Sequence, residues 1–256
     1  MITFHTRRAM LALAVGTVLA VPVRASEAPR TYAALSLIAD GLRNVGQEAT
    51  TGSLIANNPR ATSPLAFDVL ELPALRAVLG AVMAADAKAK VMPLKITDTA
   101  VYEQQNTYIE ADRAKLPSEI LEPLRQGGVT HLVLLTRHRA AARMDSDMGM
   151  LGSGTVEGVG FYLDREYQLR QRQRSEITTG YLAPFVYLKA SLIDLKTLRV
   201  VNTQISTYGR VFTASGKAVG ADPWMILSDA EKIQRLREMI QQQVTSAVTK
   251  LLVGSA

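Results

Sequence analysis

The sequence of 256 residues contains no cysteine, so it forms no disulfide and offers no thiolate to a metal ion, an iron–sulfur cluster or a nucleophilic mechanism. Charged residues make up 20% of the chain and hydrophobic residues 48%. This balance excludes a disordered chain and a multi-span membrane protein. A globular protein of this length can bury a sizeable core without covalent cross-links.

Motifs that carry catalysis are also missing. The sequence has no Gly-x-Ser-x-Gly, Ser-x-x-Lys or His-Glu-x-x-His pattern. Residues 215–217 (SGK) lack the upstream glycine and the following hydroxyl residue of a phosphate-binding loop. The glycines between 152 and 160 precede a strand instead of opening a helix, which excludes a dinucleotide-binding turn. We therefore predict a protein that is not an enzyme and has no cofactor.

Histidine is scarce, with three residues in the chain. His131 and His138 are seven positions apart on an expected strand, so their side chains point to opposite faces. Asp145 and Asp147 lie in a region rich in glycine and methionine, where we expect solvated carboxylates. The sequence therefore predicts no metal site, because zinc needs further ligands beside such residues.

The first 25 residues have the three parts of a cleavable signal peptide. Two arginines at positions 7 and 8 precede an apolar run over residues 10–21, and the segment ends with small or compact residues at 23 and 25. The apolar run is too short to stay as a membrane span. We predict export to the periplasm of a Gram-negative bacterium, with a single domain over residues 26–256 and no membrane span after cleavage.

The export route and the charge follow from the same segment. Residues 6–11 (TRRAML) resemble a twin-arginine signal, but we expect the general secretory route. Removal of the signal peptide takes away three arginines and no acid, which leaves 26 basic and 23 acidic residues, a net charge of +3. Such a mild excess does not indicate nucleic-acid binding.

Periodicity predicts the order of secondary structure. Strands are expected at residues 31–45 with an interruption at Asp40–Gly41, and at 91–96, 129–136, 161–174, 181–194 and 199–207. A hairpin partner is expected near residues 52–55 and a loop at 57–64. A helix is expected to begin near Pro73, and a second helical region to cover residues 99–126 with a break at 115–117.

The C-terminal part predicts the clearest helix. Residues 228–231 (SDAE) form a capping box, and apolar residues then recur at helical spacing to Leu251. Together the elements predict an α/β (α+β) sandwich. Its sheet is mixed and largely antiparallel, flanked by helices and closed by a long C-terminal amphipathic helix.

The order of elements resembles a group of bacterial envelope proteins. The strand at 129–136 (VTHLVLLT) follows a helix that ends in Gly127–Gly128, and the strand at 187–194 (YLKASLID) precedes a turn and a further strand. This order is similar to that in the N-terminal domain of TolB, in the curli secretion protein CsgG, in the flagellar protein FlgO and in LpoB. The resemblance covers about residues 90–252 and implies a non-enzymatic envelope role with no catalytic residue to carry over.

One cluster of charge is a candidate binding surface. Arg170, Arg172 and Arg174 alternate with glutamines in an expected strand arm over residues 161–174, so their side chains lie on one face roughly 7 Å apart. Three more arginines lie within residues 137–143. We interpret the arm as a surface for an envelope protein or an anionic envelope component. The alternative is a solvated hairpin arm whose charges discourage aggregation.

Residues 144–160 are expected to form a loop rich in glycine and methionine. Met144, Met148 and Met150 in it make an adaptable contact surface or a mobile loop.

Two other classes of function stay open. The first is a small-molecule binder or a hydrolase with an unrecognised carboxylate site, for which Asp40 and Asp194 are the acids best placed at strand ends. The second is a self-assembling subunit that uses exposed strand edges.

Overall fold

A computed structural model of the protein describes residues 30–47, 60–63, 67–170, 177–213 and 222–254. The predicted signal peptide and the hairpin partner expected near residues 52–55 lie outside the described residues. The strands are β1 (Thr31–Leu37), β2 (Leu42–Gly46), β3 (Arg60–Ser63), β4 (Lys90–Leu94), β5 (Ile109–Glu110), β6 (Arg113–Ala114), β7 (His131–Arg137), β8 (Arg139–Ala141), β9 (Met144–Ser146), β10 (Gly149–Leu151), β11 (Thr155–Arg170), β12 (Ile177–Asp194) and β13 (Arg199–Gly209). The helices are α1 (Phe67–Ala85), α2 (Thr99–Gln104), α3 (Ser118–Gln126) and α4 (Asp229–Val253), with 3₁₀ turns η1 (Gln105–Thr107) and η2 (Pro223–Ile226).

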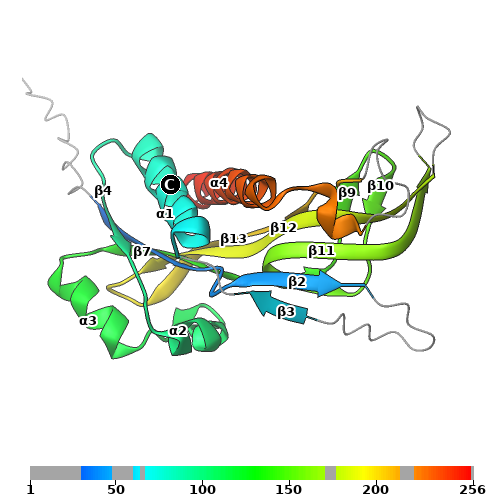
Figure 1. The fold of residues 1–256 in the computed structure, drawn as a ribbon. Coiled ribbons are helices and arrows are strands. Elements are labelled where there is room, and N and C mark those ends of the chain that lie inside the picture. The colour runs from blue at the N-terminus through cyan, green and yellow to red at the C-terminus, as the bar shows by residue number, and fades with distance from the viewer. Residues whose placement is uncertain (1–29, 48–59, 64–66, 171–176, 214–221, 255–256) are drawn as a thin grey trace, which may run out of the picture.

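The long strand β12 organises the sheet. Along one edge it pairs antiparallel with β13; along the other it pairs antiparallel first with β11 and then with β7. Beyond β7 the sheet continues through β1 to β4 in parallel, and beyond β11 it continues through β2. Figure 1 shows β11 and β2 on one side of the molecule and β4 and β7 on the other. The sheet is mixed and largely antiparallel, which confirms the predicted fold class.

Three hydrophobic clusters fill the space around this sheet. Helices α1 and α4 lie side by side over one face (Figure 1) and bury the largest cluster against β1, β7 and β12. Helices α2 and α3 cover the opposite face at the β4–β7 end. The segment from β8 to β10 covers that face at the β11 end, against tyrosines of β11 and β12. On this face, the middle of β13 lies between the α2–α3 segment and the β8–β10 segment, and its side chains there are exposed at alternate positions.

Several local predictions are confirmed. Strand β7 is buried almost throughout and lies between β1 and β12, as its nearly continuous apolar run indicates. Helix α4 begins with the predicted capping box, in which Ser228 Oγ accepts from the Glu231 N–H and a Glu231 carboxylate oxygen accepts from the Ser228 N–H. The turn between β12 and β13 also lies where it was expected.

The helix boundaries differ from the prediction. Pro73 lies inside α1, which begins at Phe67. Leu70 and Glu71 are buried with the core-facing side of the helix, and this burial outweighs the hydrogen bond that proline cannot donate. The region 99–126 is also divided earlier than expected, since α2 ends at Gln104 and the short pair β5–β6 precedes α3.

The predicted glycine- and methionine-rich loop is wrong. Residues 144–151 form the hairpin β9–β10, and β11 already begins at Thr155. Met144 is fully buried in the third cluster, whereas Met148 and Met150 are exposed. The expected loop at 57–64 likewise contains β3, which pairs with β2. β9 and β10 pair with each other as a local hairpin, whereas β3 and β11 form by pairing with strands further away in the sequence, which local composition does not show.

Candidate functional site

The predicted arginine surface falls mainly outside the described residues. Arg170 is the last residue of β11 and is paired with Ile177 of β12. Its side chain is not among those described, and Arg172 and Arg174 lie outside the described residues. The arm stays a predicted contact surface.

The three arginines within residues 137–143 differ in their exposure to solvent. Arg139 and Arg143 are exposed. Arg137, the last residue of β7, is buried with 8% of its surface exposed. Its Nη1 donates to Asp40 Oδ1 at 3.0 Å. The expectation that Arg137 adds to an outer anion-binding surface is therefore wrong, because its guanidinium is already paired inside the protein.

Arg137 is the centre of a polar cluster at the carboxyl ends of β1 and β7. Its Nη2 donates to the carbonyl oxygen of Tyr102 at 2.6 Å, and its backbone N–H donates to Gln105 Oε1 at 2.7 Å. Its Nε lies 3.8 Å from a carboxylate oxygen of Glu157. One side chain therefore joins the turn after β1, the α2–η1 segment and β11.

Glu71 of α1 lies next to this cluster and is also buried, with 1% of its surface exposed. One of its carboxyl oxygens accepts from the Ala39 N–H at 2.9 Å. Burial raises the pKa of Glu71 to about 7, and the hydrogen bond from Ala39 opposes this rise. The carboxyl group is therefore largely protonated in mildly acidic solution.

The two acids considered for a carboxylate site lie far apart. Asp40 is paired with Arg137 at the end of β7. Asp194 ends β12 opposite His131, the first residue of β7, and accepts from the Lys196 N–H at 2.8 Å. The length of β7 separates them, roughly 20 Å. Asp40 forms an ion pair with Arg137, and Asp194 accepts a hydrogen bond within the turn that follows β12. The structure therefore does not bring the two acids together as a pair of carboxylates.

The two histidines of the described chain also lie at opposite ends of β7. His131 Nδ1 is 2.9 Å from Thr130 Oγ1, and its ring is 5.4 Å from that of Tyr32. Burial, together with the nearby charge of Lys189, lowers the pKa of His138. Within the described residues no three histidine or carboxylate side chains are grouped so that they could hold a metal ion.

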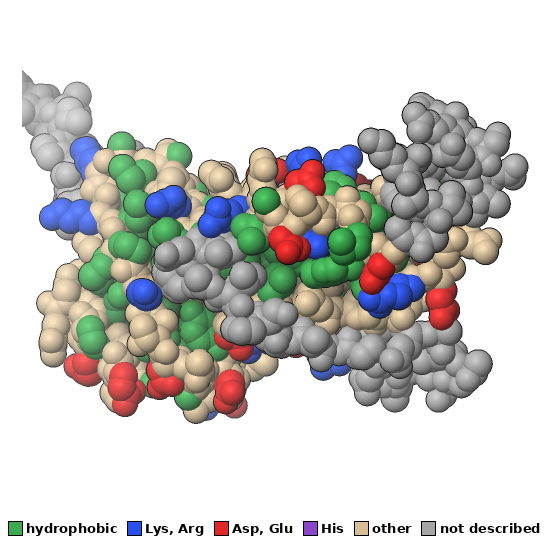
Figure 2. All heavy atoms as spheres, viewed as in Figure 1, with side chains coloured by type: hydrophobic (Ala, Val, Ile, Leu, Met, Phe, Trp, Pro, Cys, Tyr) green, Lys and Arg blue, Asp and Glu red, His purple; other side chains and the backbone are tan. Residues whose placement is uncertain are grey.

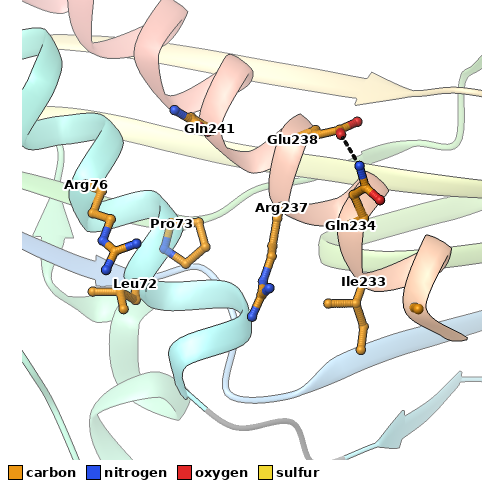
Figure 3. A pocket seen from close by; sticks show the side chains of 9 residues that line it. Leu72, Pro73, Arg76, Ile233, Gln234, Arg237, Glu238 and Gln241 are labelled. Atoms are coloured by element: carbon orange, nitrogen blue, oxygen red, sulfur yellow. Dashed lines mark hydrogen bonds between the residues drawn. The ribbon is translucent and has the colours of Figure 1, made fainter.

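A groove between α1 and α4 is lined by charged and apolar side chains of described residues. Its volume is about 980 Å³. Helix α1 contributes Leu72, Pro73 and Arg76, and the first half of α4 contributes the opposite wall. The α4 residues lining it are Ala230, Ile233, Gln234, Arg237, Glu238 and Gln241. In Figure 3 the side chains of Arg76 and Arg237 extend into the space between the two helices.

The basic and acidic side chains of this groove differ in whether they already have a hydrogen-bond partner. Arg76 and Arg237 form no ion pair or hydrogen bond with any other residue that the structure describes. The acid of the groove, Glu238, is already engaged, since it accepts from Gln234 Nε2 at 2.9 Å (dashed line in Figure 3) and from Arg235 Nη1 at 3.2 Å. The groove therefore presents two available guanidinium groups beside apolar walls.

The sequence gives little signal for this site. Arg76 and Arg237 each follow a core leucine on an amphipathic helix, and such charged residues are usually solvated. Only the packing of α1 against α4 brings them to one groove, although 161 positions separate them in the chain. A sequence pattern at helical spacing predicts which face is buried but not which helices become neighbours.

No family model and no curated protein matches the chain. Among solved structures, it is similar to a Xanthomonas campestris protein of family DUF330, with a TM-score of 0.39 and 14% identity, covering 88% of this chain and 84% of that one. It is similar to a Helicobacter pylori homolog of a neuraminyllactose-binding hemagglutinin (TM-score 0.36, 8% identity, 90% and 88% covered). It is also similar to a lipoprotein of Neisseria meningitidis (TM-score 0.26, 10% identity, 86% and 100% covered).

These structural neighbours are bacterial proteins, and one is a lipoprotein. At these scores the likenesses assign neither a partner nor an activity to this chain. The resemblance to the TolB, CsgG, FlgO and LpoB group stays a prediction. No helix in the described part of the chain is long and apolar enough to cross a membrane.

Proposed function

We propose that the protein is a non-enzymatic interaction protein of the bacterial envelope and docks an acidic segment of another envelope protein in the groove between α1 and α4. One observation carries this proposal. Arg76 and Arg237, from separate helices, line the same groove and have no charged partner among the described residues. The predicted signal peptide supports the compartment, since it would deliver the chain to the periplasm.

The chemistry of the groove favours a peptide carboxylate over a purely apolar ligand. A guanidinium group donates two parallel hydrogen bonds to a carboxylate, and such charge-assisted bonds are stronger than neutral ones. Leu72, Pro73 and Ile233 line the same groove and offer apolar surface beside the charges. An amphipathic segment with acidic residues next to aliphatic ones would satisfy both parts.

The distribution of charge over the surface also favours an acidic partner at the groove between α1 and α4. In the view of Figure 2, Lys and Arg side chains stand beside hydrophobic ones over α1 and α4, with a few acidic side chains among them over α4, and the largest group of acidic side chains lies at the lower left, over α2 and α3. An acidic partner would be attracted to the first region and repelled by the second. Complementary charge of this kind sets the orientation and the rate of association.

Fluorescence anisotropy with an acidic probe tests the proposal. The probe is a fluorescein-labelled amphipathic peptide with glutamate and leucine on one helical face. We expect the mature protein to bind it, and Arg76→Glu/Arg237→Glu to weaken binding by at least about tenfold, because each charge-assisted bond contributes roughly 1.5 kcal/mol. Higher salt should weaken binding to the unchanged protein.

The matched control is Lys88→Glu/Arg113→Glu, which makes the same change in net charge at exposed positions outside the groove. This control should retain binding. Equal losses in both double variants would mean that net charge, and not the groove, attracts the probe, and the proposal would then fail. Thermal melting of each variant checks that the fold is intact.

A further inference from the structure

Strand β13 has a long open edge. One edge is paired with β12 from Arg199 to Gly209. On the other edge, β6 pairs only at Arg199, and a single bridge joins Asp145 to Arg210. Among the described residues nothing pairs with the edge between these two points. A register shift at Val201 marks a bulge, so the regular open edge runs from residue 202 to residue 209.

The backbone groups on this edge point outward in a fixed pattern. The Arg210 N–H donates to the Pro184 carbonyl oxygen. In the regular part of β13, the even-numbered residues therefore direct their backbone N–H and C=O groups toward β12. The Thr203 N–H does not donate to β12; it donates to the side-chain oxygen Oδ1 of the neighbouring Asn202 at 2.8 Å. Since direction alternates along a strand, Thr203, Ile205 and Thr207 direct their N–H and C=O groups to the open edge.

This edge lacks the usual protection against pairing. Soluble proteins protect open edges with charged residues or proline, yet no residue between Arg199 and Arg210 is charged or is a proline. Ile205 exposes 55% of its surface, and Val201, at the bulge, exposes 46%. The edge therefore combines strand-forming residues, exposed apolar side chains and, within the described chain, backbone N–H groups of Ile205 and Thr207 that are not paired with another strand.

The sequence of the edge is self-complementary. Ile205 is flanked symmetrically by Thr203 and Thr207, and it lies at the middle of residues 202–208. In a second copy running antiparallel about a two-fold axis at Ile205, each Thr203 faces Thr207 of the other copy. Threonine pairs and β-branched pairs of this kind stabilise neighbouring strands.

We infer that two copies of this chain pair through β13, antiparallel and centred on Ile205, and form one continuous sheet. The same patch serves on both copies, as two-fold symmetry requires. The pairing is independent of the proposed docking function, since the groove lies on the side of α4 that faces α1 (Figure 3). It would place two grooves on one dimer.

Sedimentation velocity of the mature chain over a range of concentrations tests the pairing. We expect a monomer–dimer equilibrium. Ile205→Glu, which would set two carboxylates opposite each other at the axis, should raise the dissociation constant by more than about tenfold. The control Met83→Glu, at an exposed methionine of α1, should leave it unchanged. A monomer at all concentrations, or a dimer unaffected by Ile205→Glu, would overturn the inference.

Cross-linking tests the register, because the chain has no cysteine of its own. Across a hydrogen-bonded antiparallel pair the Cα atoms are about 5.5 Å apart, within the range of a disulfide. Ile205→Cys should therefore give a covalent dimer on oxidation. Val201→Cys should not, since the two introduced thiols would be roughly 27 Å apart along the strands. Cross-linking of Val201→Cys in preference to Ile205→Cys would overturn the register.

Discussion

Glu71 brings a carboxyl group into the core between α1 and the turn after β1. Its N–H donor, Ala39, immediately precedes Asp40, which is paired with Arg137. A neutral Glu71 keeps the hydrogen bond to Ala39, whereas an ionised Glu71 adds a buried negative charge close to Asp40. The protonation of this one residue is therefore linked to the stability of the whole strand-end cluster.

Glu71 predicts a pH dependence of stability. Burial raises its folded-state pKa from 4.5 to about 7, so the folded state holds a proton that the unfolded state releases between these pH values. Stability should fall as the pH rises from about 4.5 to about 7 and level off above. Glu71→Gln should remove this dependence and raise the free energy of unfolding at pH 8 by about 3 kcal/mol.

Urea denaturation at pH 5 and pH 8 measures this effect. Glu103→Gln, at an exposed position of α2, provides the comparison and should follow the unchanged protein at both pH values. A Glu71→Gln variant that loses stability at pH 8 would contradict the assignment of a costly buried charge.

At the scale of an element, Gly160 controls how closely β2 approaches β11. The two strands pair in parallel with Gly160 opposite Arg43. A methyl group on Gly160 would overlap the backbone carbonyl of Arg43. Glycine inside a strand often marks such a close approach of another backbone.

Two glycine substitutions with opposite expected signs test this packing. Gly160→Ala should destabilise the protein by more than about 2 kcal/mol, because β2 must move away. Gly80→Ala, in α1 with nothing within 4 Å of the added atom, should stabilise it by up to about 1 kcal/mol. Thermal and urea unfolding measure both. A neutral Gly160→Ala would contradict the close approach of the two strands.

The elements that could be predicted from the sequence are those with strong local signals. Helix α4 has a capping box and a continuous apolar stripe, and β7 has a nearly unbroken apolar run. For the glycines near 152–160, the prediction from local composition was wrong. Their composition indicates a loop, but Gly158 and Gly160 lie within β11 because β12 and β2 pair with it. Pairing between distant segments decided the structure there.

At the scale of the whole molecule, the fold class was predictable and the site was not. Alternating and helical periods define which faces are buried, and burial limits the possible layers. The groove depends on α1 and α4 being neighbours, and no local pattern links Arg76 to Arg237. The predicted cluster Arg170, Arg172 and Arg174 was visible only because its members are adjacent in the sequence.

The measurement that tests the central claim most directly is partner capture in living cells. Tagged versions of the full chain are cross-linked in the envelope, purified and analysed by mass spectrometry. The set comprises the unchanged chain, Arg76→Glu/Arg237→Glu, Lys88→Glu/Arg113→Glu and Arg170→Glu/Arg172→Glu/Arg174→Glu. We predict one specific envelope protein that the unchanged chain and the Lys88/Arg113 control capture and that the groove variant loses. Capture by the groove variant at the level of the unchanged chain, with loss only in the arm variant, would contradict docking in the groove.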